Sequence, residues 1–135
     1  MSDYNSQYSG TRIEELLAMI PNLAKADLSN AMTVSLGSSG YAKFNNGLLI
    51  QWGGNISGIQ GERTIYLPSS FMDTNYRVVL TADPGSKSIF DTIVSPMLLS
   101  RGTSYFKACL RYYDNGSIYG YGSWNIEWYA IGRWK

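Results

Sequence analysis

The sequence contains no histidine and only one cysteine among its 135 residues. Without histidine, His-based acid–base catalysis, Ser-His-Asp and Cys-His nucleophile systems and most zinc sites are excluded. Cys109 cannot form an internal disulfide, so stability must come from packing or from assembly. Cys109 shares its predicted strand face with Lys107 and Arg111, and without a histidine base we expect a packed or interfacial thiol. We therefore expect no metal and no cofactor.

Charge is sparse as well. Eleven lysines and arginines face ten aspartates and glutamates, which gives a net charge of +1, and the basic residues are scattered singly. This distribution lacks the basic patch of a nucleic-acid-binding protein. No signal peptide and no long apolar run are present, so we expect no membrane insertion and release by another route, such as cell lysis.

In place of charge, the sequence has fourteen glycines and eleven tyrosines, which suit turns and pleated surfaces. The run Gly47–Gly53 consists mainly of apolar residues and has a glycine at each end. Both faces of this run are apolar except for Gln51, which predicts a buried strand in the middle of a sheet. Asn45-Asn46-Gly47 has the chemistry of a turn, and Tyr41–Phe44 is predicted as the first arm of a hairpin.

Alternating apolar residues and turn residues continue along the rest of the chain. Further strands are predicted at Arg63–Leu67, Tyr76–Asp83, Ser88–Val94, Tyr105–Tyr113 and Trp124–Ile131. Six or seven strands separated by Gly, Pro, Asn and Asp turns indicate an all-β fold, an antiparallel β-sandwich. We assign this domain to residues 41–135.

Residues 1–40 are predicted to form a flexible segment, a short helix and a linker that ends at Gly37–Gly40. Thr11 and Glu14 have the spacing of a capping box, and Pro21 stops the helix. The helix carries one apolar stripe, made of Ile13, Leu16, Leu17 and Ile20. A helix of about ten residues is marginal alone, so this stripe must pack on its own domain or on copies of itself in a fibre neck.

The aromatic residues divide into two groups. Four alternate with polar residues and are predicted to lie in the core: Trp52, Phe71, Phe106 and Trp128. A second group surrounds two turn signals in what we interpret as a loop from Tyr112 to Trp124. The candidate ligand-binding residues are Arg111, Tyr112, Tyr113, Asp114, Asn115, Tyr119, Tyr121 and Trp124. Aromatic rings can stack on sugars while Asn, Asp and Arg bind hydroxyls, although packing at a subunit interface or within the loop would use the same residues.

Hydrolysis of a polysaccharide would need two carboxylates that face each other. The carboxylates of the β region are Glu62, Asp73, Asp83, Asp91, Asp114 and Glu127. Most of them lie beside turn residues, where Asp and Glu are ordinary. We therefore expect no catalytic residues and no enzymatic activity.

Three blocks of this sequence resemble a known family. They are Gly-Leu-Leu-Ile-Gln-Trp-Gly at Gly47–Gly53, Ile65–Pro68 followed by Phe71, and Trp-Tyr-Ala-Ile-Gly at Trp128–Gly132. In this order and at about this spacing, they are similar to the signature blocks of the C-terminal domain of bacteriophage tail fibres. The resemblance covers roughly residues 40 to 133, and Asn22–Asn30 resembles a linker common in tail-fibre proteins.

The resemblance implies a receptor-binding domain at the tip of a phage or prophage tail fibre. It implies a homotrimer that is attached to an upstream fibre shaft and that adheres to the host through a bacterial surface polysaccharide or a teichoic-acid-like polymer. Such a protein is made in the cytoplasm of the infected or lysogenic bacterium and becomes part of the virion. Two alternatives remain open, a free-standing β-sandwich lectin and a structural trimerisation domain without a ligand of its own.

Overall fold

The computed structural model describes residues 7, 9–23, 25, 27–55, 61–83, 92–114, 117–121 and 124–135. The chain divides into two compact units, Met1–Met32 and Thr33–Lys135. The first unit holds the helix α1 (Gly10–Met19) and the 3-10 helix η1 (Ile20–Asn22), which follows it directly. The second unit holds two β-sheets.

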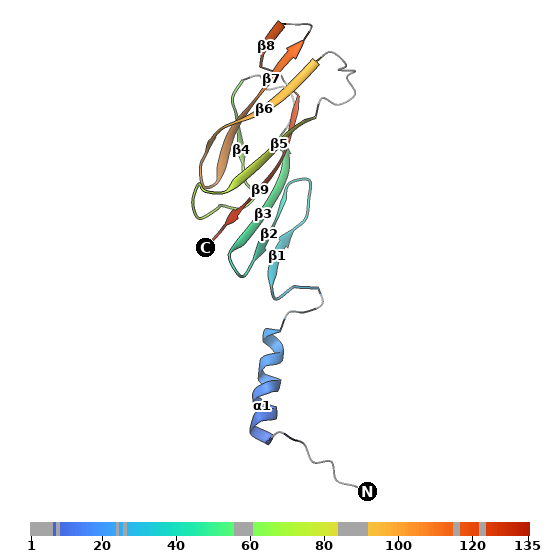
Figure 1. The fold of residues 1–135 in the computed structure, drawn as a ribbon. Coiled ribbons are helices and arrows are strands. Elements are labelled where there is room, and N and C mark those ends of the chain that lie inside the picture. The colour runs from blue at the N-terminus through green and yellow to red at the C-terminus, as the bar shows by residue number, and fades with distance from the viewer. Residues whose placement is uncertain are drawn as a thin grey trace. The chain divides into compact units, whose positions relative to one another are not determined.

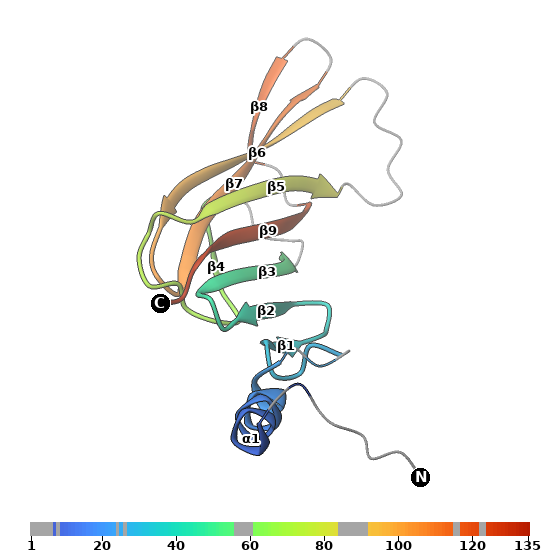
Figure 2. The same ribbon diagram turned by 60° about the horizontal axis from the view of Figure 1, so that its bottom comes forward.

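The strands of the described residues form two sheets, which Figures 1 and 2 show from two sides. The five-stranded sheet contains, in spatial order, β1 (Met32–Ser35), β2 (Gly40–Phe44), β3 (Leu48–Asn55), β9 (Asn125–Arg133) and β5 (Arg77–Asp83). The second sheet contains β4 (Arg63–Tyr66), β7 (Tyr105–Asp114) and β6 (Thr92–Arg101), and β8 (Ser117–Tyr121) pairs with β7. The predicted antiparallel β-sandwich is confirmed.

The strand count differs from the prediction, because the described residues contain nine strands rather than six or seven. β1 lies within the stretch that we assigned to the linker, and β8 lies within the predicted loop. Both are short, so each offers too few residues for an alternating pattern to stand out. β6 also continues past Pro96 to Arg101 instead of ending at Val94.

The predicted hairpin between Tyr41–Phe44 and the central run is confirmed, since β2 and β3 pair antiparallel. Gly47 has a φ of 102°, a conformation that suits glycine and that closes the turn. Its N–H donates to the Phe44 carbonyl at 3.0 Å, while the Asn46 side chain accepts from the Leu48 N–H at 3.0 Å. The turn signal in the sequence therefore predicted the hairpin correctly.

The buried face of β3 is the opposite of the face that was predicted from Trp52. Leu49, Gln51 and Gly53 are buried, whereas Trp52 is only half-buried. The Trp52 indole N–H donates to the Gly37 carbonyl at 3.0 Å, so the ring is held by the β1–β2 connection. The prediction that Trp52 lies in the core is wrong, because a run that is apolar on both sides does not reveal which side faces inward.

The core fills the space between the two sheets, and the predictions for Phe71, Phe106 and Trp128 are confirmed. Trp128 and Phe106 meet edge to face, with ring centroids 5.4 Å apart, and so join β9 to β7. A Cβ at Gly53 would lie 2.7 Å from Cζ2 of Trp128, so only glycine leaves room for this indole. The buried apolar cluster comprises Leu49, Ile65, Leu67, Phe71, Tyr76, Phe106, Ala108, Leu110, Ile126, Trp128 and Ala130.

Tyr76 anchors the corner that leads into β7. Its ring stacks on Phe71 with centroids 4.2 Å apart, and its hydroxyl donates toward the carbonyl oxygens of Gly102 and Tyr105 at 3.0 and 2.9 Å. Burial raises the pKa of Tyr76 to about 12 from an ordinary value of 10.0. The folded state therefore keeps this proton at a pH where the unfolded chain has lost it.

We expect the domain to lose up to about 3 kcal/mol of stability as the pH rises from about 10 to 12. The sign follows from the protons bound, because in this window the folded state holds one more proton than the unfolded state. Below pH 10 the contribution is fully present. Denaturant titrations at several pH values measure this slope, and the Tyr76→Phe variant should flatten it. An unchanged slope in that variant would contradict the assignment to Tyr76.

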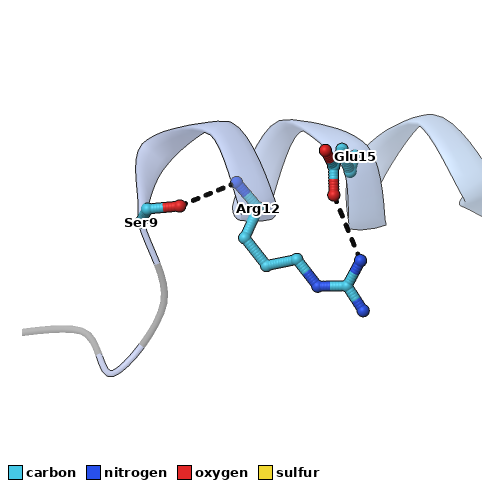
Figure 3. Close-up of polar contacts among 3 residues, drawn as sticks. All are labelled: Ser9, Arg12 and Glu15. Atoms are coloured by element: carbon cyan, nitrogen blue, oxygen red, sulfur yellow. Dashed lines mark hydrogen bonds and ion pairs between the residues drawn. The ribbon is translucent and has the colours of Figure 1, made fainter.

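In the first unit, α1 is confirmed but its cap is not the predicted one. Ser9 is the N-cap, and its hydroxyl accepts from the Arg12 N–H at 3.2 Å (Figure 3). The Arg12 guanidinium also pairs with Glu15 at 3.1 Å. The capping box of Thr11 and Glu14 is wrong because the helix begins at Gly10, which places Thr11 inside its first turn.

After η1, which contains Pro21, the side chain of Asn30 holds the chain in a turn. The Asn30 side chain accepts from the Lys25 N–H at 2.8 Å and donates to the Leu23 carbonyl. None of the helical residues of α1 is buried, so its apolar stripe is available for contacts. Along the described part of the chain, no helix is long and apolar enough to cross a membrane.

Candidate functional site

The candidate site centres on the hairpin of β7 and β8, which extends beyond the end of the five-stranded sheet (Figures 1 and 2). Tyr112 pairs with Tyr119, and Arg111 pairs with Tyr121, with a register irregularity between Arg111 and Tyr112. The interpretation of the segment from Tyr112 to Trp124 as a loop is therefore wrong. Backbone pairing brings six of the predicted residues together on two adjacent strands: Arg111, Tyr112, Tyr113 and Asp114 on β7, and Tyr119 and Tyr121 on β8.

The structure describes some of the candidate ligand-binding residues completely and others only in part. Arg111 is exposed, and Tyr113 is 40% exposed beside Ile93 of β6, its register partner. For Asp114, Tyr119 and Tyr121 only the backbone is described, and Asn115 lies outside the described residues. Two aromatic residues, Tyr112 and Trp124, are half-buried.

Trp124 packs inward instead of standing out as a stacking platform. It contacts the core cluster, and its ring meets Tyr112 edge to face with centroids 5.3 Å apart. This contact joins the segment before β9 to the base of the β7–β8 hairpin. Trp124 is thus better placed to support the hairpin than to contact a ligand directly.

Arg63 is a residue of this region that the sequence analysis missed. It begins β4, is 1% exposed, and donates from Nη1 to the Trp124 carbonyl at 2.6 Å. Burial lowers the pKa of the Arg63 guanidinium, a sign that the charge has been taken out of water. Arg63 therefore ties the second sheet to the same segment that Tyr112 contacts. Its alternation with Ile65 and Leu67 could have placed it on the inner face.

Three of the groups considered for catalysis are buried or already have a partner. Cys109 is buried, which agrees with a packed thiol. Glu62 pairs with Lys107 at 2.6 Å, and the Asp73 carboxylate accepts from the Asn75 N–H at 2.8 Å within a turn. Among the residues that the structure describes, no group of three His, Cys, Asp or Glu side chains could hold a metal ion.

A second notable surface is the outer face of the five-stranded sheet. We define the outer apolar face by Ile50 of β3, Val79 of β5, and Tyr129 and Ile131 of β9. Val79 and Tyr129 are register partners, as are Ile50 and Ile131, so these side chains adjoin across three strands. Val79 and Tyr129 are 61% and 62% exposed. A continuous apolar surface of this kind is typical of a contact with another protein.

The family comparison matches most of the second unit. A family model described as "Putative tail fiber protein gp53-like, C-terminal" matches residues 43–133. The match extends from β2 through β9 and includes the whole β7–β8 hairpin. No curated protein matches the chain.

Two solved structures share the fold. An N-truncated R2-type pyocin tail fibre matches with a TM-score of 0.58 and 17% identity, over 98% of this chain and 55% of that one. A C-terminal part of the P. aeruginosa R2 pyocin fibre matches with a TM-score of 0.57 and 17% identity, over 98% of this chain and 38% of that one. The chain thus spans about half the length or less of these fibre structures.

Proposed function

Because this chain belongs to the family of gp53-like tail fibre C-terminal domains, we propose that it is the receptor-binding tip of a tail fibre on a phage or prophage-encoded particle. The observation that carries the proposal is the family match over residues 43–133, which includes the complete candidate site. The proposed role is attachment, without enzymatic activity. The fibre shaft would precede the tip.

We propose that the tip is a homotrimer. The outer apolar face supports this, because Val79, Tyr129 and Ile131 expose surface that a neighbouring copy would cover. The predicted apolar stripe of the first unit supports it too, since Leu17 of α1 and Ile20 of η1 are 58% and 55% exposed. Self-association of this stripe would form the neck between tip and shaft.

Light scattering on the full chain should give the mass of three copies at micromolar concentration. Hydrophobic contacts between copies are the physical reason, so the Tyr129→Asp variant should lower the mass by placing a charge in the outer apolar face. Leu36→Asp is a matched control, because Leu36 is 83% exposed and lies outside that face. A stable monomer of the unmodified chain would contradict the trimer.

For the ligand, we propose a bacterial surface polysaccharide or a teichoic-acid-like polymer. Its contacts would come from Tyr119 and Tyr121 on β8, with Arg111 and Asp114 binding hydroxyls from β7. The register, which sets Tyr121 opposite Arg111, supports a shared site. Loops and hairpins carried by a rigid sheet often serve recognition.

Co-sedimentation with candidate host cells tests the proposal. Labelled full-length protein should pellet with host cells, and the bound fraction should fall when purified envelope glycan is added as competitor. If the protein bound none of a panel of candidate host strains, including the strain from which its gene comes, this result would count against a receptor-binding role.

A purely structural role in fibre assembly is the second candidate. The inward packing of Trp124 favours it, because this residue supports the fold instead of presenting a ring to solvent. In that case the trimer would form as expected, but neither cells nor purified glycans would bind to it. The same two measurements therefore separate the two candidates.

A further inference from the structure

The outer face of the second sheet carries a cluster that is separate from the β7–β8 hairpin. Tyr66 of β4 and Tyr105 of β7 are register partners, and Thr64 is the partner of Lys107 one step further along the same strands. Glu62 lies just ahead of β4 and pairs with Lys107. We call these five residues the tyrosine–lysine cluster.

Tyr66 has the exposure of a binding residue. Its side chain is 76% exposed, although it lies on a regular strand between the buried residues Ile65 and Leu67. Its ring stands edge-on to that of Tyr105, with centroids 6.5 Å apart and an interplanar angle of 60°. The pair therefore offers an open aromatic surface with a supporting second ring.

Tyr105 is held rigidly. Its carbonyl oxygen accepts from the Gly102 N–H at 2.8 Å and from the Tyr76 hydroxyl at 2.9 Å. A Cβ at Gly102 would lie 2.5 Å from Cε1 of Tyr105, so the ring lies across this glycine. Little conformational freedom is left to lose when a ligand binds to the pair, which favours affinity.

Polar groups stand beside the rings at a suitable distance. Two residues along a strand span roughly 6.6 Å, which is comparable to one sugar ring. Lys107 Nζ and Glu62 Oε1 are 2.6 Å apart, and their side chains remain 36% and 52% exposed. The pair offers donors and acceptors side by side without net charge, and Thr64 adds an exposed hydroxyl.

From this juxtaposition we infer that the tyrosine–lysine cluster is a second saccharide subsite, which binds a neutral hexopyranose unit. The apolar C–H face of the sugar stacks on Tyr66, and neighbouring hydroxyls bind Lys107 and Glu62. The lack of net charge argues for a neutral sugar over an anionic phosphate polymer, which would need unpaired cations. The inference deepens the proposed function, on which it rests, by naming the sugar class and a second place of contact.

Saturation-transfer NMR on the full chain tests the subsite with monovalent probes. The probes are the methyl glycosides of glucose, galactose and mannose, with glycerol phosphate as the anionic comparison. At least one neutral glycoside should receive saturation, and the Tyr66→Ala variant should weaken its binding by about tenfold or more, which is about 1.4 kcal/mol. Tyr66→Phe keeps the ring and should stay within about twofold. Leu36→Ala removes an exposed apolar side chain that lies outside both the cluster and the outer apolar face, and it should change nothing.

The subsite would be overturned by no transfer to any neutral glycoside, by transfer to glycerol phosphate alone, or by equal transfer with Tyr66→Ala. A change of oligomer mass in Tyr66→Ala would also overturn it, because the cluster would then be a subunit contact. Failure of the proposed function looks different, since the unmodified protein would then not bind cells whatever the glycosides show. If the protein binds cells but none of the glycosides, only the subsite is contradicted and the proposed function stands.

Discussion

Replacing Trp128 by alanine is expected to lower the free energy of unfolding by about 3–5 kcal/mol. Trp128 is 2% exposed, and its indole fills the space above Gly53 and meets Phe106 of the opposite sheet. Removal of the ring leaves a cavity between β9 and β7, which a close-packed core cannot fill by small shifts. Since a domain is stable by only about 5–15 kcal/mol, much of its stability would be lost.

Equilibrium denaturation of Trp128→Ala measures this effect, and Trp52→Ala is the matched control. Trp52→Ala should cost clearly less, because Trp52 is half-buried on the outer face and its main specific contact is the hydrogen bond to the Gly37 carbonyl. If both variants lost the same stability, the assignment of Trp128 to the core and of Trp52 to the outer face would be wrong.

The second large effect is on attachment. Substituting Tyr119 and Tyr121 together by alanine is expected to abolish binding of the assembled protein to host cells, while oligomer mass and melting temperature stay unchanged. Single contacts of this shallow kind are weak, but several identical sites on one assembly raise avidity by about 10² to 10⁴ over single-site affinity. A modest loss at each site is therefore multiplied across the assembly.

The double variant with phenylalanine at both positions is the matched control. It keeps both aromatic rings, so it should retain most of the binding if stacking is the main contact. Unchanged cell binding in the alanine variant would place the site elsewhere, and loss of the oligomer would instead identify the hairpin as a subunit contact.

The sequence predicted the parts of the fold that have strong local signals. Strong alternation located β7, and the turn at Asn45-Asn46-Gly47 located the β2–β3 hairpin. It could not predict which side of β3 faces inward, because both sides are apolar. The answer came from tertiary contacts, in which Gln51 is buried and its side-chain oxygen accepts from the Ser69 N–H at 2.7 Å.

The candidate site was predicted in part. Tyr112, Tyr119 and Tyr121 surround two turn signals in the sequence and were therefore predicted to lie near one another. The register of β7 and β8 shows that their backbones adjoin. The sequence did not indicate that Trp124 packs inward or that Arg63 holds its carbonyl, since this contact joins residues 61 positions apart in the chain. Tyr66 was overlooked, although its alternation with the apolar residues Ile65 and Leu67 could have placed it on the outer face.

The central claim is that this domain attaches an assembled fibre tip to a bacterial surface. The most direct measurement records, on the same dilution series, the oligomer mass by light scattering and the fraction of protein bound to host cells. We predict that trimers bind and that the bound fraction falls steeply as the trimer dissociates. An intact trimer that leaves every tested cell surface and every purified envelope glycan unbound would contradict the account.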